Sequence, residues 1–255
     1  MALGAGAQEV TKADAYRERL SELEDWEPYL LAESGLPGPR ANLELVQVVA
    51  DMGEQGLFER FLGYGPEAAP TNSPHEFLAV CGIVGMGRLL AEGQVDLLER
   101  IREQANDPRW RMREGVAMAL QRWGDKDVDG LTKTMNLWSR GSLLEQRAAA
   151  AALCEPRLLG EENNARKTLH ILDAITASIS EVADRRSDDF KALRKGLGYC
   201  WSVAVVALPE VGKPLMEKWL TSTDKDVIWI MKQNLGKARL ARMDAEWVEN
   251  CKAKP

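Results

Sequence analysis

The spacing of apolar positions along the chain predicts helices almost throughout. Over residues 108–123, apolar side chains recur every three or four positions and therefore share one face of a helix. These side chains are Met112, Val116, Ala119, Leu120 and Trp123. The one β-branched run, VAVVA at 203–207, lies inside a longer apolar stretch that is typical of a buried helix. We therefore predict an all-α fold.

The same helical unit recurs along the chain. The 108–123 helix is followed by the turn GDKDV and by a second helix that ends near Trp138. Arg113 and Arg147 stand 34 residues apart, each before a run of small residues. Upstream, VCGIVGMGRLLAEGQVDLLERI aligns with REGVAMALQRWGDKDVDGLTKTM at a similar offset, and downstream the spacing loosens around a long helix predicted over 163–184. Such a period is typical of repeat proteins, because one helix pair cannot bury its apolar face alone.

The segment DPRWRMREGVAMALQRWGDKDVDGL resembles a HEAT-type repeat, with its Asp, its apolar–Arg pair, its alanines and its leucine. The resemblance covers roughly residues 75–240. It implies a right-handed superhelical α-solenoid of about five to six helix pairs, in which the Asp–Arg helices line the concave surface. KWLTSTDKDVIWIMKQNLGKARL is also similar to segments of the HEAT-like DNA-alkylation-repair glycosylases.

Breaks in the pattern predict the boundaries of the elements. A capping helix over about 11–32, within an N-terminal segment 1–36, precedes the repeat domain 37–255, and it either covers the open end of the stack or docks on another protomer. Asp107 and Pro108 are suited to begin the helix that follows them. The glycines of GIVGMG favour close helix packing over a phosphate-binding loop, because no strand precedes them and no Lys-Ser/Thr follows.

The charge distribution and the amino-acid composition limit which kinds of partner and which compartment we expect. The net charge of −6 is concentrated in residues 1–60, which hold five basic and twelve acidic residues, and this argues against indiscriminate nucleic-acid binding without excluding a local basic groove. We find no apolar run of about 18 residues and no signal peptide, and therefore expect a cytoplasmic protein without a membrane span. Four dispersed cysteines favour reduced, buried thiols over a disulfide or a metal site: Cys81, Cys154, Cys200 and Cys251.

Two tryptophans stand out as candidates for the concave face. Trp110 points away from the apolar face of its helix, together with Glu114 and Gln121. Trp229 takes the equivalent place in the last repeat, beside Gln233. A tryptophan in a groove stacks on a base or anchors a partner's side chain. Packing against the neighbouring repeat is the alternative, and we favour it.

Basic residues recur at the same point of each repeat, at Arg113, Arg147, Arg194 and Lys232. More basic residues lie nearby, at Arg109, Arg111, Lys191 and Lys195. We call the recurring residues Arg113, Arg147, Arg194 and Lys232 the basic ladder. One interpretation is that the basic ladder binds phosphates or an acidic peptide. The other is that its members form ion pairs with aspartates of adjacent repeats. We favour bridging, for which Asp107, Asp189 and Asp226 are the available partners.

No catalytic constellation emerges from the chain. The only histidines, His75 and His170, fit no metal-ligand pattern, and the carboxylates of RSDDF (186–190) suit a helix start better than acid–base chemistry. We predict no catalytic residue, cofactor or metal ion, although an enzyme is not excluded. The favoured function is a non-catalytic HEAT-like scaffold that binds a protein or peptide on its concave face.

The alternative is a nucleic-acid-binding or DNA-alkylation-repair-like protein of the glycosylase type. The second resemblance implies aromatic residues and a carboxylate in the groove, and Trp110, Trp229 and Asp226 are the nearest matches in chemistry. An accessory or lyase-like factor for a small ligand is a third possibility, which no particular residue supports.

Overall fold

A computed structural model describes residues 11–253, and in this range the chain forms fifteen α-helices, two 3₁₀ turns and no strand. The predicted all-α fold is confirmed. The helices of the first half are α1 (Lys12–Ser21), α2 (Glu27–Glu33), α3 (Leu43–Met52), α4 (Gln55–Leu62), α5 (Pro74–Ala91), α6 (Leu97–Gln104) and α7 (Trp110–Gly124). Those of the second half are α8 (Val128–Trp138), α9 (Leu143–Leu153), α10 (Glu162–Ser178), α11 (Asp188–Ala207), α12 (Pro209–Leu220), α13 (Lys225–Leu235), α14 (Ala238–Met243) and α15 (Ala245–Lys252). The 3₁₀ turns are η1 (Pro156–Leu159) and η2 (Ile179–Glu181).

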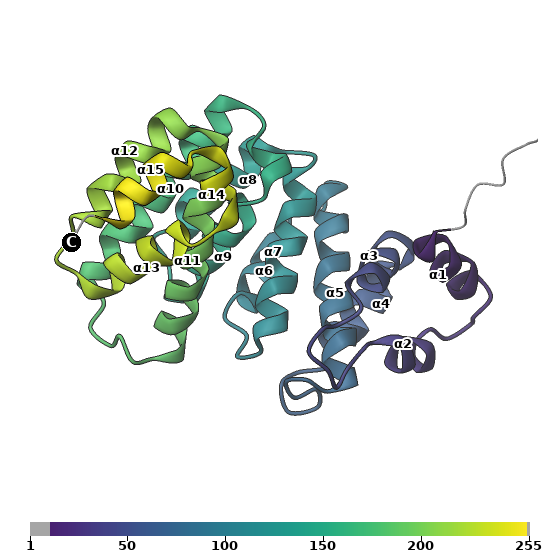
Figure 1. Ribbon diagram of the computed structural model, residues 1–255. Helices are drawn as coiled ribbons and strands as arrows, with labels where there is room; N and C mark the ends of the chain where they lie inside the picture. Colours follow the sequence, from purple (N-terminus) through teal and green to yellow (C-terminus); the bar gives the residue numbers. More distant parts are fainter. Residues whose placement is uncertain (1–10, 254–255) are drawn as a thin grey trace, which may run out of the picture.

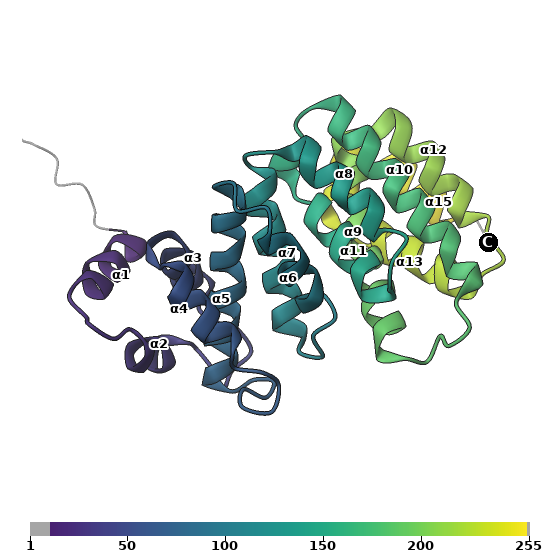
Figure 2. The ribbon, with the colours of Figure 1, turned by 180° about the vertical axis from the view of Figure 1, so that it is seen from behind.

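Alternate helices pack side by side in chain order. From α5 to α13, each odd-numbered helix contacts the next odd-numbered one (Figure 1). The even-numbered helices form a second row, in which α10 contacts both α8 and α12 (Figure 2). The buried apolar side chains make one connected cluster that runs from Tyr16 to Cys251. Each helix therefore buries its apolar face against its neighbours in both rows.

Small residues allow α5 and α7 to pack closely against each other. A Cβ atom added at Gly87 would lie 2.3 Å from the Cα atom of Ala119, and one added at Gly115 would lie 2.6 Å from Ile83. Gly85 faces the ring of Phe58 in the same way, at 2.3 Å. The prediction that the GIVGMG glycines serve close packing is confirmed, since they lie inside α5.

The helices of the central repeat match the pattern from which they were predicted. All five apolar positions of the 108–123 helix are buried in α7. The second helix ends at Trp138, as predicted, and the β-branched run 203–207 forms the end of α11. The long helix is shorter than predicted, because α10 ends at Ser178, gives way to η2, and leaves residues 182–184 outside any helix.

The single N-terminal helix predicted over about 11–32 is wrong: α1 and α2 are separate. Pro28 lies in the first turn of α2 and cannot continue a helix that arrives from residue 21. α1 packs on α3, and α2 packs on α5. Residues 1–10 of the proposed capping segment lie outside the described residues.

The start of α7 also differs from the prediction. α7 begins at Trp110, and Arg109 rather than Asp107 occupies the N-cap position without a side-chain cap. The buried Asp107 carboxylate instead accepts from the Arg109 backbone N–H at 2.7 Å and pairs with its guanidinium at 2.7 Å. Arg109 in turn donates to the carbonyls of Tyr64 and Ala69. The loop 63–74 is thereby held to the beginning of α7.

Arg111 joins the beginning of α7 to α5 and to the loop before α3. Its guanidinium pairs with the fully buried Glu76 at 3.1 Å and donates to the carbonyl of Gly38 at 2.8 Å. Arg109 and Arg111 are therefore occupied in structural contacts.

Among residues 11–253, no helix is both long and apolar enough to cross a bilayer.

Candidate binding groove

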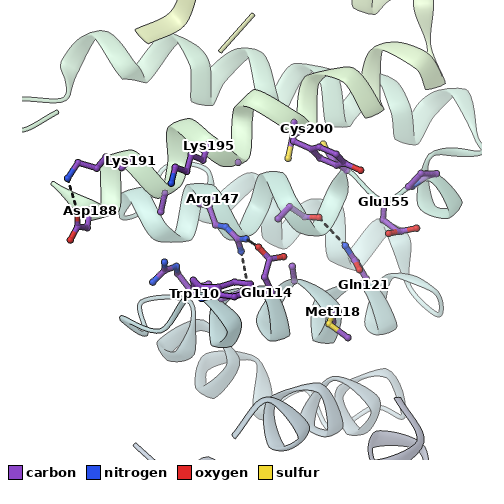
Figure 3. Close-up of a pocket in the computed structure, with 18 residues that line it drawn as sticks. Trp110, Glu114, Met118, Gln121, Arg147, Glu155, Asp188, Lys191, Lys195 and Cys200 are labelled. Atoms are coloured by element: carbon purple, nitrogen blue, oxygen red, sulfur yellow. Dashed lines mark hydrogen bonds and ion pairs between the residues drawn. The ribbon is translucent and has the colours of Figure 1, made fainter. Parts of the chain in front are cut away.

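A cavity of about 750 Å³ opens between α7, α9 and α11 (Figure 3). Its α7 wall carries Trp110, Arg113, Glu114 and Gln121, four of the residues that the sequence nominated, and Arg147 joins them from α9. The structure therefore brings five of the nine nominated site residues together around one hollow.

Trp110 lies at one end of this groove with 46% of its surface exposed. The Arg111 guanidinium lies 4.4 Å from the centre of its ring, which fixes one indole face and leaves the groove side open. Further along α7, the Gln121 side-chain amide donates to the Ala151 carbonyl of α9 at 3.1 Å. Trp110 is thus only partly covered by its neighbours.

Glu114 and Arg147 join the two walls at the middle of the groove. The buried Arg147 guanidinium pairs with the Glu114 carboxylate and donates to the Arg113 carbonyl at 2.7 Å. The Glu114 side chain is 53% exposed, so the carboxylate keeps access to the cavity. The arrangement presents an anchored carboxylate beside an exposed indole.

Cations gather around the Trp110 end. The Arg113 guanidinium donates only to backbone carbonyls, those of Asp107 at 2.7 Å and Pro108 at 2.8 Å. Its burial and the neighbouring Arg147 lower the pKa of Arg113. Lys195 on α11 is exposed, and within residues 11–253 neither it nor Arg113 forms an ion pair with a carboxylate. Lys191 pairs with the exposed Asp188 at 2.8 Å. Four basic and three acidic residues line the groove, so its lining carries a small excess of positive charge.

The opposite end is more apolar and was not identified from the sequence. Tyr199, 47% exposed, lies there with Met118 and Pro156, and the Arg239 guanidinium lies 4.6 Å from its ring centre. Tyr199 follows Lys191 and Lys195 at intervals of four residues along α11, so it shares their face. That spacing was the signal that could have revealed it.

The last repeat does not contribute to this groove. Trp229 is half-buried beneath the Arg194 guanidinium, which lies 4.0 Å from its ring, and Lys232 and Gln233 are exposed on α13. Asp226 accepts from Arg194 at 2.7 Å and from Arg185 at 3.2 Å. Trp229 and Asp226, which the sequence offered together with Trp110 as groove candidates, are therefore not part of the lining of this cavity, because α13 packs on α11 and contributes no residue to it.

The basic ladder divides into bridging and open members. Arg194 bridges α11 to Asp226 of α13, as predicted, whereas Arg147 bridges α9 to Glu114 rather than to an aspartate. Arg113 does not pair with the Asp107 carboxylate, because Arg109 occupies it. Among the described residues, His75 and His170 lie outside the groove, and no cluster of three potential metal ligands occurs.

A second hollow of about 400 Å³ continues the groove toward the end of α7. Met118 and Gln121 line both hollows, and Arg122 adds a cation that donates to Asp51 at 2.8 Å. The surface open to a ligand therefore follows α7 along most of its length.

Comparison with protein-family models finds no match, and comparison with curated protein sequences finds none either. The assignment of this site therefore depends on its geometry and chemistry.

Proposed function

We propose that this chain is a HEAT-like α-solenoid that binds a protein or peptide in the groove between α7, α9 and α11, without catalysing a reaction. The side-by-side contacts of the odd-numbered helices from α5 to α13 support a solenoid, in which these helices would line the concave surface. The neutral charge of the chain after residue 60 favours a protein partner over unspecific binding to nucleic acid.

The groove has the size and polarity for a short extended peptide. The α7 wall from Trp110 to Gln121 is about 16 Å long at the helical rise, which about five residues of an extended strand would span. An apolar or aromatic side chain would pack on Trp110, and an acidic side chain would face Arg113 and Lys195. The apolar end around Tyr199 and Met118 would hold a second apolar side chain.

The observation that carries this proposal is the exposure of Trp110 inside the cavity. An indole with one face fixed by Arg111 and the other open loses little conformational freedom when a partner covers it. Such an aromatic residue, exposed in a groove and flanked by cations, is typical of a binding hot spot.

The test is a selection of random peptides on the immobilised full chain, followed by affinity measurements on three proteins. Wild type and Leu137→Ala should bind the selected peptides equally, because Leu137 is 62% exposed on α8 and does not line the groove. Trp110→Ala should bind at least about tenfold more weakly while keeping its helix content. Peptides that bind Trp110→Ala as tightly as wild type would refute the groove assignment.

One observation favours nucleic acid as the second candidate. Trp110, Glu114 and Arg147 place an exposed indole beside an anchored, half-exposed carboxylate, with Lys191 and Lys195 on the facing wall. This is the combination of aromatic residue and groove carboxylate that the glycosylase resemblance implies. Glu114, not Asp226, would then be the carboxylate concerned.

A fluorescence titration with labelled duplex DNA separates the two functions. Contacts with several phosphates would weaken binding by orders of magnitude between about 50 and 200 mM salt. We expect the scaffold to bind DNA weakly at both salt concentrations. Tight, steeply salt-dependent binding that Lys191→Glu abolishes would replace the peptide proposal with the nucleic-acid one.

A further inference from the structure

Basic side chains surround Tyr199 at the apolar end of the groove. Lys237 occupies the N-cap position of α14, and Arg239 lies within that helix. The Lys237 Nζ atom lies 5.7 Å from the centre of the Tyr199 ring, and the Arg239 guanidinium lies 4.6 Å from it. Arg239 also donates a hydrogen bond to the Tyr199 hydroxyl. Because Tyr199 lines the groove, these contacts connect the groove to α14, which packs on α11 (Figure 1).

Two further cations extend this group along the two helices. Arg242 follows Arg239 by three positions on α14, and Lys195 precedes Tyr199 by four positions on α11, so each lies beside that residue on its helix. Lys195 and Arg242 are exposed, and Lys237 and Arg239 are half-buried. We call Lys195, Lys237, Arg239 and Arg242 the Tyr199 cluster.

The Tyr199 cluster differs from the other cations of α11 and α12 in having no acidic partner. Lys191 pairs with Asp188, Arg194 with Asp226, and Lys213 with Asp244. Within residues 11–253, none of the four members of the cluster forms an ion pair with a carboxylate. The segment 227–243 holds four basic and no acidic residues, so the chain around α14 supplies no local counter-charge.

The two arginines of the cluster keep most of their donors. A guanidinium has five N–H donors in a planar arrangement that matches a carboxylate. Arg239 is held against the Tyr199 ring and gives a hydrogen bond to its hydroxyl, and no hydrogen bond within the described residues involves the Arg242 side chain. Both can therefore pair with carboxylates, and Arg239 loses little conformational freedom in doing so.

We propose that the Tyr199 cluster binds an acidic segment of the peptide that occupies the groove. This inference rests on the proposed binding function and specifies the chemistry of the partner. An apolar side chain packs on Tyr199, and the aspartate or glutamate residues next to it pair with Arg239, Arg242 and Lys237 over α14. The peptide therefore leaves the groove at the Tyr199 end with negative charge.

The acidic residues of the groove favour a peptide over a nucleic acid at this surface. Glu114, Glu155 and Asp188 line the cavity together with its cations. A nucleic-acid strand carries a negative charge at every nucleotide and would place phosphates beside these carboxylates. A peptide can confine its acidic residues to the end that passes over α14.

The experiment selects random peptides on the immobilised full chain, on the double variant Lys237→Glu/Arg242→Glu and on a charge-matched control. The control is Lys126→Glu/Lys133→Glu, which makes the same change of charge at two exposed positions that line neither hollow. Peptides selected on the wild type and on the control should carry Asp or Glu on one side of an apolar residue. Peptides selected on Lys237→Glu/Arg242→Glu should lack this enrichment.

Affinity measurements on one peptide selected by the wild type give the size of the effect. Lys237→Glu/Arg242→Glu should raise its Kd at least about tenfold at about 0.1 M salt, where the screening length is about 10 Å. The increase should shrink at about 1 M salt, where that length is about 3 Å. Replacing the Asp and Glu residues of the peptide by Asn and Gln should also weaken its binding to the wild type. This last measurement decides even if the double variant fails to fold.

Selected peptides without acidic residues, or a Kd that the charge reversal leaves unchanged, would overturn the inference. A short oligothymidylate that binds the wild type more tightly than the acidic peptide, and Lys237→Glu/Arg242→Glu more weakly, would overturn it in favour of nucleic acid. Binding that requires Trp110 but no acidic residue would refute this inference alone. Acidic peptides that require the cluster but bind Trp110→Ala as tightly as wild type would refute the groove assignment alone. A selection that yields no peptide would overturn both.

Discussion

The packing of α5 on α7 can be tested by adding a single methyl group at Gly87. Alanine there would place its Cβ atom 2.3 Å from the Cα atom, 2.5 Å from the carbonyl oxygen and 2.6 Å from the Cβ atom of Ala119. Two of these three atoms belong to the backbone of α7 and cannot rotate away. The helices would have to separate by about 1 Å to restore van der Waals contact.

The magnitude follows from two opposing effects. Alanine is favoured over glycine within a helix by up to about 1 kcal/mol, whereas overpacking in a dense interior costs about 1–3 kcal/mol. Because backbone atoms and not a flexible side chain cause the clash, we expect overpacking to prevail. Gly87→Ala should lower the free energy of unfolding by about 1–2 kcal/mol, which corresponds to a fall in Tm of roughly 2–8 °C for a chain of this size.

Urea unfolding followed by circular dichroism measures this difference, with Gly56→Ala as the matched control. Gly56 also lies in a helix, α4, but nothing lies within 4 Å of an added Cβ atom. This variant should be neutral or more stable by up to about 1 kcal/mol. If Gly87→Ala were as stable as Gly56→Ala, α5 and α7 would not be in the close contact on which the stacking argument depends.

Two further predictions concern ion pairs. Arg111→Met leaves the fully buried Glu76 carboxylate without its cation and should cost about 3–5 kcal/mol in urea unfolding, whereas a cost below about 1 kcal/mol would show that the pair is solvated. The hydrogen bond from Arg185 holds the pKa of Asp224 in the folded protein below its ordinary value of 3.8. The ionised Asp224 carboxylate therefore stabilises the fold above pH 3.8. This stabilisation is lost as the pH falls through the lower pKa of the folded state. Asp224→Asn, which retains an N-cap side chain for α13, should therefore be about 1 kcal/mol less stable than wild type at pH 7, and this difference should shrink as the pH falls below 3.8. A difference that does not change with pH would contradict this cause.

The sequence was sufficient to predict the all-α fold and the two faces of α7. Met112, Val116 and Leu120 recur at helical spacing and are buried, and Trp110 and Glu114 lie on the opposite face, where the structure places them in a groove. Local periodicity determines both results, because the residues concerned belong to one helix.

The parts of the groove that depend on contacts between helices were not predicted. Trp229 repeats the position of Trp110, yet Arg194 of α11 covers it, and only the packing of α11 on α13 reveals this. Cys154 and Cys200 are 46 residues apart, and nothing in their spacing indicates that both line the same cavity. The start of α7 was predicted incorrectly for a related reason. The Asp107 carboxylate accepts from the Arg109 backbone N–H and pairs with the Arg109 guanidinium, and it does not cap the helix.

The most direct test of the central claim, that the groove between α7, α9 and α11 is the binding surface, is the affinity of a selected peptide for Trp110→Ala relative to wild type. The variant removes an exposed side chain, so its Tm should stay within a few degrees of the wild-type value. We predict a Kd at least about tenfold higher for the variant, equivalent to about 1.4 kcal/mol of lost binding free energy. An unchanged Kd in a folded variant would contradict the account.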